Sequence, residues 1–207
     1  MQRGSLIRLP FANLGKEKSL PAVAERPLHY RAREITQTNP AEPTTRIGLF
    51  PSCIVDHFLP GAGFAAARVL QSMGAEVHVV EGRRCCGLPQ LNSGDRTTAI
   101  AMAKAAIEAL ERVSADRIVI PSSSCAITIA QDYARILSDD PAWAERAQKL
   151  AERVTAFTPF VASVFRERPL RGRRLGLRAT YHDACQSAHV LGVHQDPRTL
   201  LREVAGV

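Results

Sequence analysis

Five cysteines are the residues of this 207-residue chain whose type and spacing are best suited to chemistry. Cys53 is followed, after 31 other residues, by the adjacent pair Cys85 and Cys86, and Cys125 comes after 38 more. A disulfide between neighbours closes a very small ring and distorts the peptide between them, so the pair is not expected to be a structural bridge. Four thiolates from three loops are enough to hold a zinc ion or an iron–sulfur cluster. The fifth, Cys185, lies in "YHDAC".

The elements that must position these thiols can be predicted from apolar patterns. Each cysteine follows a short apolar run that predicts a buried strand, and the strands alternate with helical patterns. The predicted strands are 46–50, 76–81, 117–121 and 177–183, and the predicted helices are 63–74, 94–113, 126–137, 141–154, 158–165 and 196–204. Such alternation indicates an α/β fold, with a parallel sheet and βαβ crossovers. The cysteines would then gather at the carboxyl ends of the strands, where ligand sites of such sheets lie.

Composition limits the setting of this site. The chain is 45% hydrophobic and 23% charged, as in a globular protein, and no apolar run reaches the roughly 18–20 residues of a membrane span. The N-terminal segment lacks the continuous apolar core of a secretory signal, so a cytoplasmic protein is expected. In a reducing compartment, an odd number of cysteines favours metal ligation or redox chemistry over disulfides. Buried cysteines that only fill the core are the alternative.

The positive net charge of +7 does not predict a nucleic-acid partner. Six arginines and one glutamate lie in the segment 166–178, but aromatic residues make up only 5% of the chain and none interrupts this run. A binder of single strands would need such stacking side chains. We interpret 166–178 as a solvated basic linker, with a patch for phosphate or an acidic partner as the alternative.

Three motifs resemble those of the CCG cysteine-rich domain family of iron–sulfur oxidoreductase subunits, namely "CCGLPQLNSG", "PSSSC" and "YHDAC". That family includes subunits of heterodisulfide reductase, glycolate oxidase and lactate-utilisation systems, and the last of these is the most similar. Residues 1–45 contain five prolines and no sustained period, so we expect an extended or disordered arm there. The resemblance covers about 46–207 and implies a first CCG domain over 46–165, then the basic linker at 166–178, and the start of a truncated second CCG domain over 179–207. The chain ends 22 residues after Cys185, so the second site is expected to be incomplete.

Carried over to this chain, the resemblance makes four cysteines the ligands of a first metal site, and assigns the fifth to the incomplete second site. The four are Cys53, Cys85, Cys86 and Cys125, and the fifth is Cys185. One departure matters: the family pattern closes a motif with CxxC, whereas this chain has Ser122 in place of the first cysteine of that pair. Four thiols suit a 4Fe-4S cluster or zinc, but fall short of a five-cysteine site.

The function that the resemblance implies is electron transfer within a complex that oxidises L-lactate or a related 2-hydroxy acid. The chain would be an iron–sulfur subunit rather than a self-sufficient enzyme. It would work with other subunits, without a transmembrane segment and with possible peripheral membrane association. The alternatives are a zinc-binding or structural subunit without redox activity, and a thiol–disulfide reductase subunit of the heterodisulfide reductase type, which the serine at position 122 disfavours.

Two other patterns give weaker signals. "GAGFAA" offers Gly61, Gly63 and Ala66 in a G-x-G-x-x-A arrangement, but about ten residues separate it from the preceding strand, whereas a dinucleotide site needs its glycines in the turn directly after the strand. We interpret these glycines as the entry to a closely packed helix. Histidines 182, 189 and 194 around the fifth cysteine could ligate zinc, or could be polar groups bonded to neighbouring loops.

Overall fold

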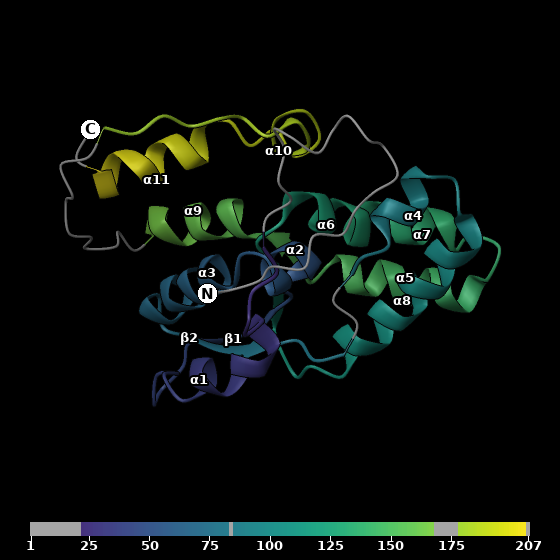
Figure 1. Ribbon diagram of the computed structural model, residues 1–207, viewed down its shortest axis with the longest axis horizontal. Coiled ribbons are helices and arrows are strands. Elements are labelled where there is room, and N and C mark those ends of the chain that lie inside the picture. Colours follow the sequence, from purple (N-terminus) through teal and green to yellow (C-terminus); the bar gives the residue numbers. More distant parts are fainter. Residues whose placement is uncertain (1–21, 83–84, 168–177, 206–207) are drawn as a thin grey trace.

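The computed structural model has one sheet of four parallel strands in the order β2-β1-β3-β4. It describes residues 22–82, 85–167 and 178–205. Figure 1 shows the neighbouring strands β1 and β2 among the surrounding helices. The central strand β1 pairs with β2 and β3, and Leu49 near its end lies opposite Val79 and Val119. The carboxyl ends therefore meet at one edge, as the α/β prediction requires. The strands are β1 (Thr45–Leu49), β2 (Ala75–Val79), β3 (Arg117–Ile120) and β4 (Val154–Ala156).

Helices connect the strands in most of the predicted places. The patterns at 63–74, 94–113, 141–154, 158–165 and 196–204 correspond to α3, α5, α8, α9 and α11. The pattern at 126–137 corresponds to a continuous run that begins three residues earlier and contains a π-helical turn, η2. In chain order the helical elements are η1 (Leu28–Arg31, a 3-10 turn), α1 (Ala32–Thr36), α2 (Ser52–His57), α3 (Pro60–Ser72), α4 (Leu88–Asn92), α5 (Arg96–Glu111), α6 (Ser123–Ile127), η2 (Thr128–Asp132), α7 (Tyr133–Ile136), α8 (Pro141–Ala151), α9 (Phe157–Glu167), α10 (Cys185–His189) and α11 (Gln195–Ala205).

The sheet separates two hydrophobic cores. Ile118 and Ile120 face the first core, which α5, the α6–α7 run and α8 build. Val119 between them faces the second core, which η1, α1, α3 and α9 build. This alternation follows from the two-residue period of a strand. Burial on both faces explains the apolar runs at the ends of β1 and β3, whereas the edge strand β2 alternates buried apolar residues with the partly exposed Glu76 and His78.

The prediction of a fourth strand at 177–183 is wrong. Its described part, 178–183, belongs to no strand, and the fourth strand is β4, which pairs with β3 through Ile120 and Ala156. β4 has only three residues between α8 and α9, so its sequence carries too little pattern to separate it from the helix predicted over 141–154. As a consequence, Cys185 does not follow a strand but begins the short helix α10.

The expectation of an extended or disordered arm over 1–45 is also wrong for part of it, because residues 28–36 form η1 and α1. Leu28 and Ile35 anchor these turns in the second core. Pro27, one of the prolines that suggested an irregular chain, stands directly before η1, where the fixed φ of proline suits the start of a helix. Residues 1–21 lie outside the described part of the chain.

The interpretation of the "GAGFAA" glycines as the entry to a closely packed helix holds at Gly63, whereas a Cβ atom at Gly61 would meet nothing within 4 Å. A Cβ atom at Gly63 would lie 2.5 Å from Leu28 Cδ2 and 3.1 Å from Val55 Cγ1, so α3 can approach η1 and α2 only without a side chain here. The arginine-rich segment 166–178 lies outside the described residues except for positions 166, 167 and 178. Among the described helices, none is long and apolar enough to cross a membrane.

Candidate metal centre

The first four cysteines come from three segments that end at the same edge of the sheet. Cys53 is the second residue of α2, directly after β1; Cys85 and Cys86 follow β2; and Cys125 lies in α6, directly after β3. The parallel register brings the ends of these three strands side by side. Thiols that are up to 72 residues apart in the sequence are therefore neighbours in the fold.

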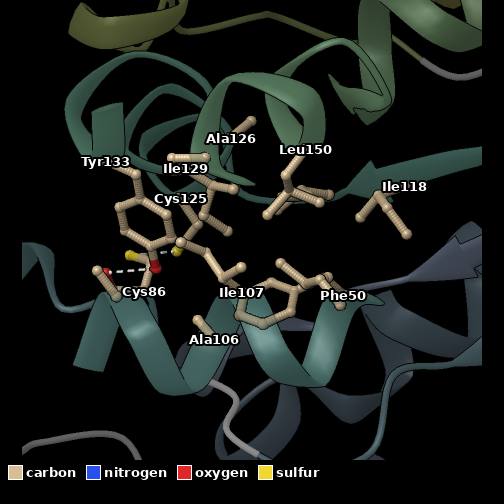
Figure 2. Packing of buried hydrophobic residues seen from close by; sticks show 14 of the residues in the cluster. Phe50, Cys86, Ala106, Ile107, Ile118, Cys125, Ala126, Ile129, Tyr133 and Leu150 are labelled. Carbon is tan, nitrogen blue, oxygen red and sulfur yellow. Dashed lines mark hydrogen bonds between the residues drawn. The ribbon is translucent and has the colours of Figure 1, made fainter. Parts of the chain in front are cut away.

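Two of the thiols form a buried pair, Cys86 and Cys125, whose side chains are only 3% and 7% exposed. The Cys86 thiol donates to the Cys125 sulfur over 3.2 Å, and Figure 2 shows the two sulfur atoms side by side within the first core. Hydrogen bonding to Cys125 and burial raise the pKa of Cys86 far above its ordinary value. The same hydrogen bond, with a further one from Ser122, lowers the pKa of Cys125.

The other two thiols form an outer pair, Cys53 and Cys85, which are half-buried. Burial raises the pKa of Cys53 to about 11, and the neighbouring Cys85 adds to this through charge repulsion and a hydrogen bond. Charge interactions also connect the two pairs, because Cys86 affects Cys53, and both outer thiols affect Cys125. All four sulfur atoms are thus close enough to influence one another's ionisation.

Residues with unusual backbone conformations stand next to the cysteines on two of the segments, Ser52 before Cys53 and Gly87 after Cys86. Ser52, which is buried, has a φ of +64°, a left-handed conformation rare for residues other than glycine, and it sets the start of α2 and hence Cys53. Gly87 has a φ of +80°, and a Cβ atom there would come within 3.2 Å of Met102 Cβ. Strain of this kind is found where the fold must hold a site. Gly87 thus allows the chain to turn tightly directly after the Cys85–Cys86 pair.

The π turn η2 brings Tyr133, which contacts the loop that carries Cys86, onto the same helix face as Cys125. Tyr133 is fully buried, and its hydroxyl donates to the Cys86 backbone carbonyl over 2.9 Å (Figure 2). Eight residues separate Tyr133 from Cys125, which would place them about 80° apart on a regular helix of 3.6 residues per turn. A π turn accommodates an extra residue, so the two side chains reach the same face. Burial, followed by repulsion from the thiols, raises the pKa of Tyr133 well above its ordinary value and keeps it a donor.

The donor set fits a metal centre in its chemistry. Thiolates are the ligands that zinc and iron–sulfur clusters prefer, and four of them complete a site of either type. In the described part of the chain, no group of three or more His, Cys, Asp or Glu side chains is already arranged to hold a metal ion. A metal that binds these thiols must displace their protons. Burial raises the pKa of Cys53, and the hydrogen bond to Cys125 and burial raise the pKa of Cys86, so both thiols hold their protons more tightly.

Comparison with known proteins agrees with this site. The family model of the cysteine-rich domain CCG matches residues 47–130, a range that contains both pairs of thiols. The chain thus contains a CCG cysteine-rich domain. It is 38% identical over 162 residues to lactate utilization protein A of Bacillus licheniformis and 39% identical to that of Bacillus velezensis, and each alignment covers 78% of this chain. The chain spans about two thirds (66%) of the length of these curated relatives. No solved structure matches the chain.

The structure does not bring the fifth cysteine into the CCG site. Cys185 is exposed at the start of α10. α10 itself packs on α6, and Ser187 donates to Ser123 over 2.7 Å, so the helix is fixed beside the site while the Cys185 thiol remains accessible. Ser122, which replaces a cysteine of the CCG pattern, shares a hydrogen bond of 3.0 Å with Ser124.

The segment around the fifth cysteine contains a polar contact that involves Asp183 and the backbone of His194 rather than a histidine ring. Arg198 binds Asp183 through two hydrogen bonds of 2.9 and 2.7 Å and also donates to the His194 carbonyl over 2.6 Å. The arginine fork thus ties α11 to the segment before α10. This pairing lowers the pKa of Asp183.

Two residues of the CCG site were missed in the sequence. Ser52 could have been found, because "PSC" after the first strand parallels "PSSSC" after the third, and both place Pro-Ser at a strand end before a cysteine. Tyr133 had no comparable signal. Its role depends on a π turn, and the helical pattern alone places it on a different face from Cys125.

Proposed function

We propose that this chain is an iron–sulfur electron-transfer subunit of a complex that oxidises L-lactate or a related 2-hydroxy acid to the 2-oxo acid. Cys53, Cys85, Cys86 and Cys125 would hold one cluster of the 4Fe-4S type. The observation that carries the proposal is the convergence of these four thiols, from three separate segments, at one edge of the sheet. The names of the relatives support the choice of substrate system.

The protein's own residues would hold the cluster, limit its contact with water and fix the loops around it. The buried pair gives it two ligands inside the first core, and Tyr133 ties the Cys86 backbone to the helix that carries Cys125. When bound, such a cluster accepts and passes on single electrons. The half-buried outer pair leaves this side of the site closer to the surface, where a redox partner can approach.

The chain would act with other subunits rather than alone. We assign the substrate chemistry and any further redox groups to those subunits, in a reducing, cytoplasmic setting. Residues 46–165 would form the first CCG domain and 179–207 the start of a second. The exposed Cys185 agrees with a thiol that belongs to another, incomplete site.

A structural zinc site is the second candidate, and it is favoured by the number of thiols. Four cysteines are the full ligand set of a closed tetrahedral zinc site, which needs no redox partner. Zinc binding would then contribute to folding, because its ligands are brought together only in the folded state.

Metal analysis separates the two candidates. Iron, acid-labile sulfide and zinc are measured on the protein purified without oxygen, together with its absorption spectrum. We expect about four iron and four sulfide per chain with broad visible absorption, the stoichiometry of a 4Fe-4S cluster. One zinc per chain without sulfide would contradict the iron–sulfur proposal and favour the structural zinc site. The absence of both metals would contradict both proposals.

A further inference from the structure

Two buried polar atoms beside the thiols lack a hydrogen-bond partner. Among the described residues, these two, Thr128 Oγ1 and Gln90 Oε1, are the buried side-chain nitrogen or oxygen atoms without one. Thr128 comes three residues after Cys125 in the same helical run, whereas Gln90 lies in α4, which begins at Leu88 after the left-handed Gly87 and does not include Cys86. Because buried polar groups are nearly always hydrogen-bonded, the orphaned hydroxyl in the run that carries Cys125 indicates that a partner belongs there.

Thr128 is the clearer of the two because its side chain is 1% exposed. A threonine inside a helix usually bonds to a backbone carbonyl of the preceding turn, but Thr128 does not. Residues three apart share a helix face, which places Thr128 on the side of Cys125. A pocket against β4 is lined by Ala126, Ile127, Ala130 and Gln131 of this run, but not by Thr128. The buried Thr128 hydroxyl therefore does not open into that pocket, and it shares a helix face with Cys125.

We propose that the Thr128 hydroxyl donates a hydrogen bond to the group held by the four thiols, either to a sulfide or to a ligating thiolate. The inference rests on the proposed function, because it needs a bound group to accept the bond. A donor to sulfur stabilises the extra negative charge of the reduced state, and so raises the reduction potential. Thr128 is thus a residue that tunes the site and does not itself ligate.

The reduction potential tests this role directly. Thr128→Val removes the hydroxyl with little change of shape, Thr128→Ser restores it, and Thr155→Val makes the same chemical change on β4 as a matched control. We expect Thr128→Val to keep wild-type iron and sulfide, while its reduced state becomes about tenfold less favoured at a given potential, a shift of about −59 mV for one electron. Thr128→Ser and Thr155→Val should stay near wild type. An unshifted potential in fully loaded Thr128→Val overturns the inference and leaves the proposed function intact.

Melting temperatures give a second, independent measurement. In the metal-free protein, removing an unpartnered buried hydroxyl should raise the melting temperature by about 2–4 °C. The increase in melting temperature on loading, with iron and sulfide or with zinc, should be smaller for Thr128→Val than for wild type. A lower melting temperature of metal-free Thr128→Val would show that the hydroxyl has a partner within the protein, and would overturn the inference. Wild-type protein that binds neither group would overturn the proposed function and this inference together.

Discussion

The buried pair and the outer pair of thiols differ in what positions them. Cys86 and Cys125 lie inside the first hydrophobic core, with their sulfur atoms 3.2 Å apart and the backbone of Cys86 held by Tyr133. Cys53 and Cys85 are half-buried. Cys53 lies on α2, a helix of six residues that depends on its contacts with η1 and α3.

This difference indicates that the fold positions the buried pair, whereas metal binding completes the positioning of the outer pair. The core fixes two ligands before any metal arrives, because moving them would disturb the packing around Phe50, Ile107 and Ile129 (Figure 2). The outer ligands have more freedom, and we expect them to complete the coordination by adjusting to the metal.

Removal of a thiol should have the largest effect. We expect Cys86→Ser and Cys125→Ser to abolish bound metal, because no other described cysteine lies in the core to replace them. Cys185→Ser is the matched control and should retain wild-type metal, since its thiol is exposed and outside the site. Iron, sulfide and zinc analysis of the three variants provides the measurement. Full metal content in Cys86→Ser or Cys125→Ser would show that the buried pair does not ligate the metal.

Alkylation should distinguish the two pairs in the metal-free protein. We expect Cys185 to react first with iodoacetamide at pH 8, the outer pair next and the buried pair last, as judged by mass spectrometry of peptides. Exposure sets this order, and the pKa of about 11 leaves roughly one Cys53 in a thousand as the reactive thiolate at that pH. The buried pair should be at least tenfold slower than Cys185. Equal rates at Cys86 and Cys185 would show that the core does not protect its thiols.

The outer pair should be sensitive to packing beneath α2. We expect Gly63→Ala to lower the free energy of unfolding by about 2–3 kcal/mol, because the new methyl group would overlap Leu28 and Val55. Chemical denaturation measures the effect. Gly61→Ala is the control, because a Cβ atom at Gly61 meets nothing within 4 Å. If both variants are equally stable, the close approach of α3 to η1 and α2 does not stabilise the packing of α2, the helix that carries Cys53.

The buried pair should in turn be sensitive to the loss of one hydroxyl. Tyr133→Phe leaves the Cys86 carbonyl without its donor, and we expect a loss of about 1–2 kcal/mol in the free energy of unfolding, or about 2–8 °C in melting temperature. Tyr30→Phe on the exposed side of η1 is the control. An unchanged melting temperature for Tyr133→Phe would mean that this bond does not fix the loop.

The sequence was sufficient for the parallel sheet and for the edge at which the thiols gather. The buried apolar runs of β1 and β3 and the alternating pattern of the edge strand β2 identify three strands, and a cysteine follows each of them. The rest depended on tertiary context. β4 is only three residues long, and helices 28–36 are stabilised by burial of Leu28 and Ile35 rather than by a regular pattern. The alignment of Tyr133 with Cys125 arises from η2, which a regular helical period does not reveal.

X-ray absorption spectroscopy of the protein purified without oxygen tests most directly whether the four cysteines hold an iron–sulfur cluster. We expect iron to be the bound metal, and every ligand in its first shell to be sulfur, from the four thiolates and the inorganic sulfides. Cys125→Ser should lose that signal. A first shell of oxygen or nitrogen ligands would contradict the assignment of these cysteines, and a sulfur shell around zinc alone would contradict electron transfer.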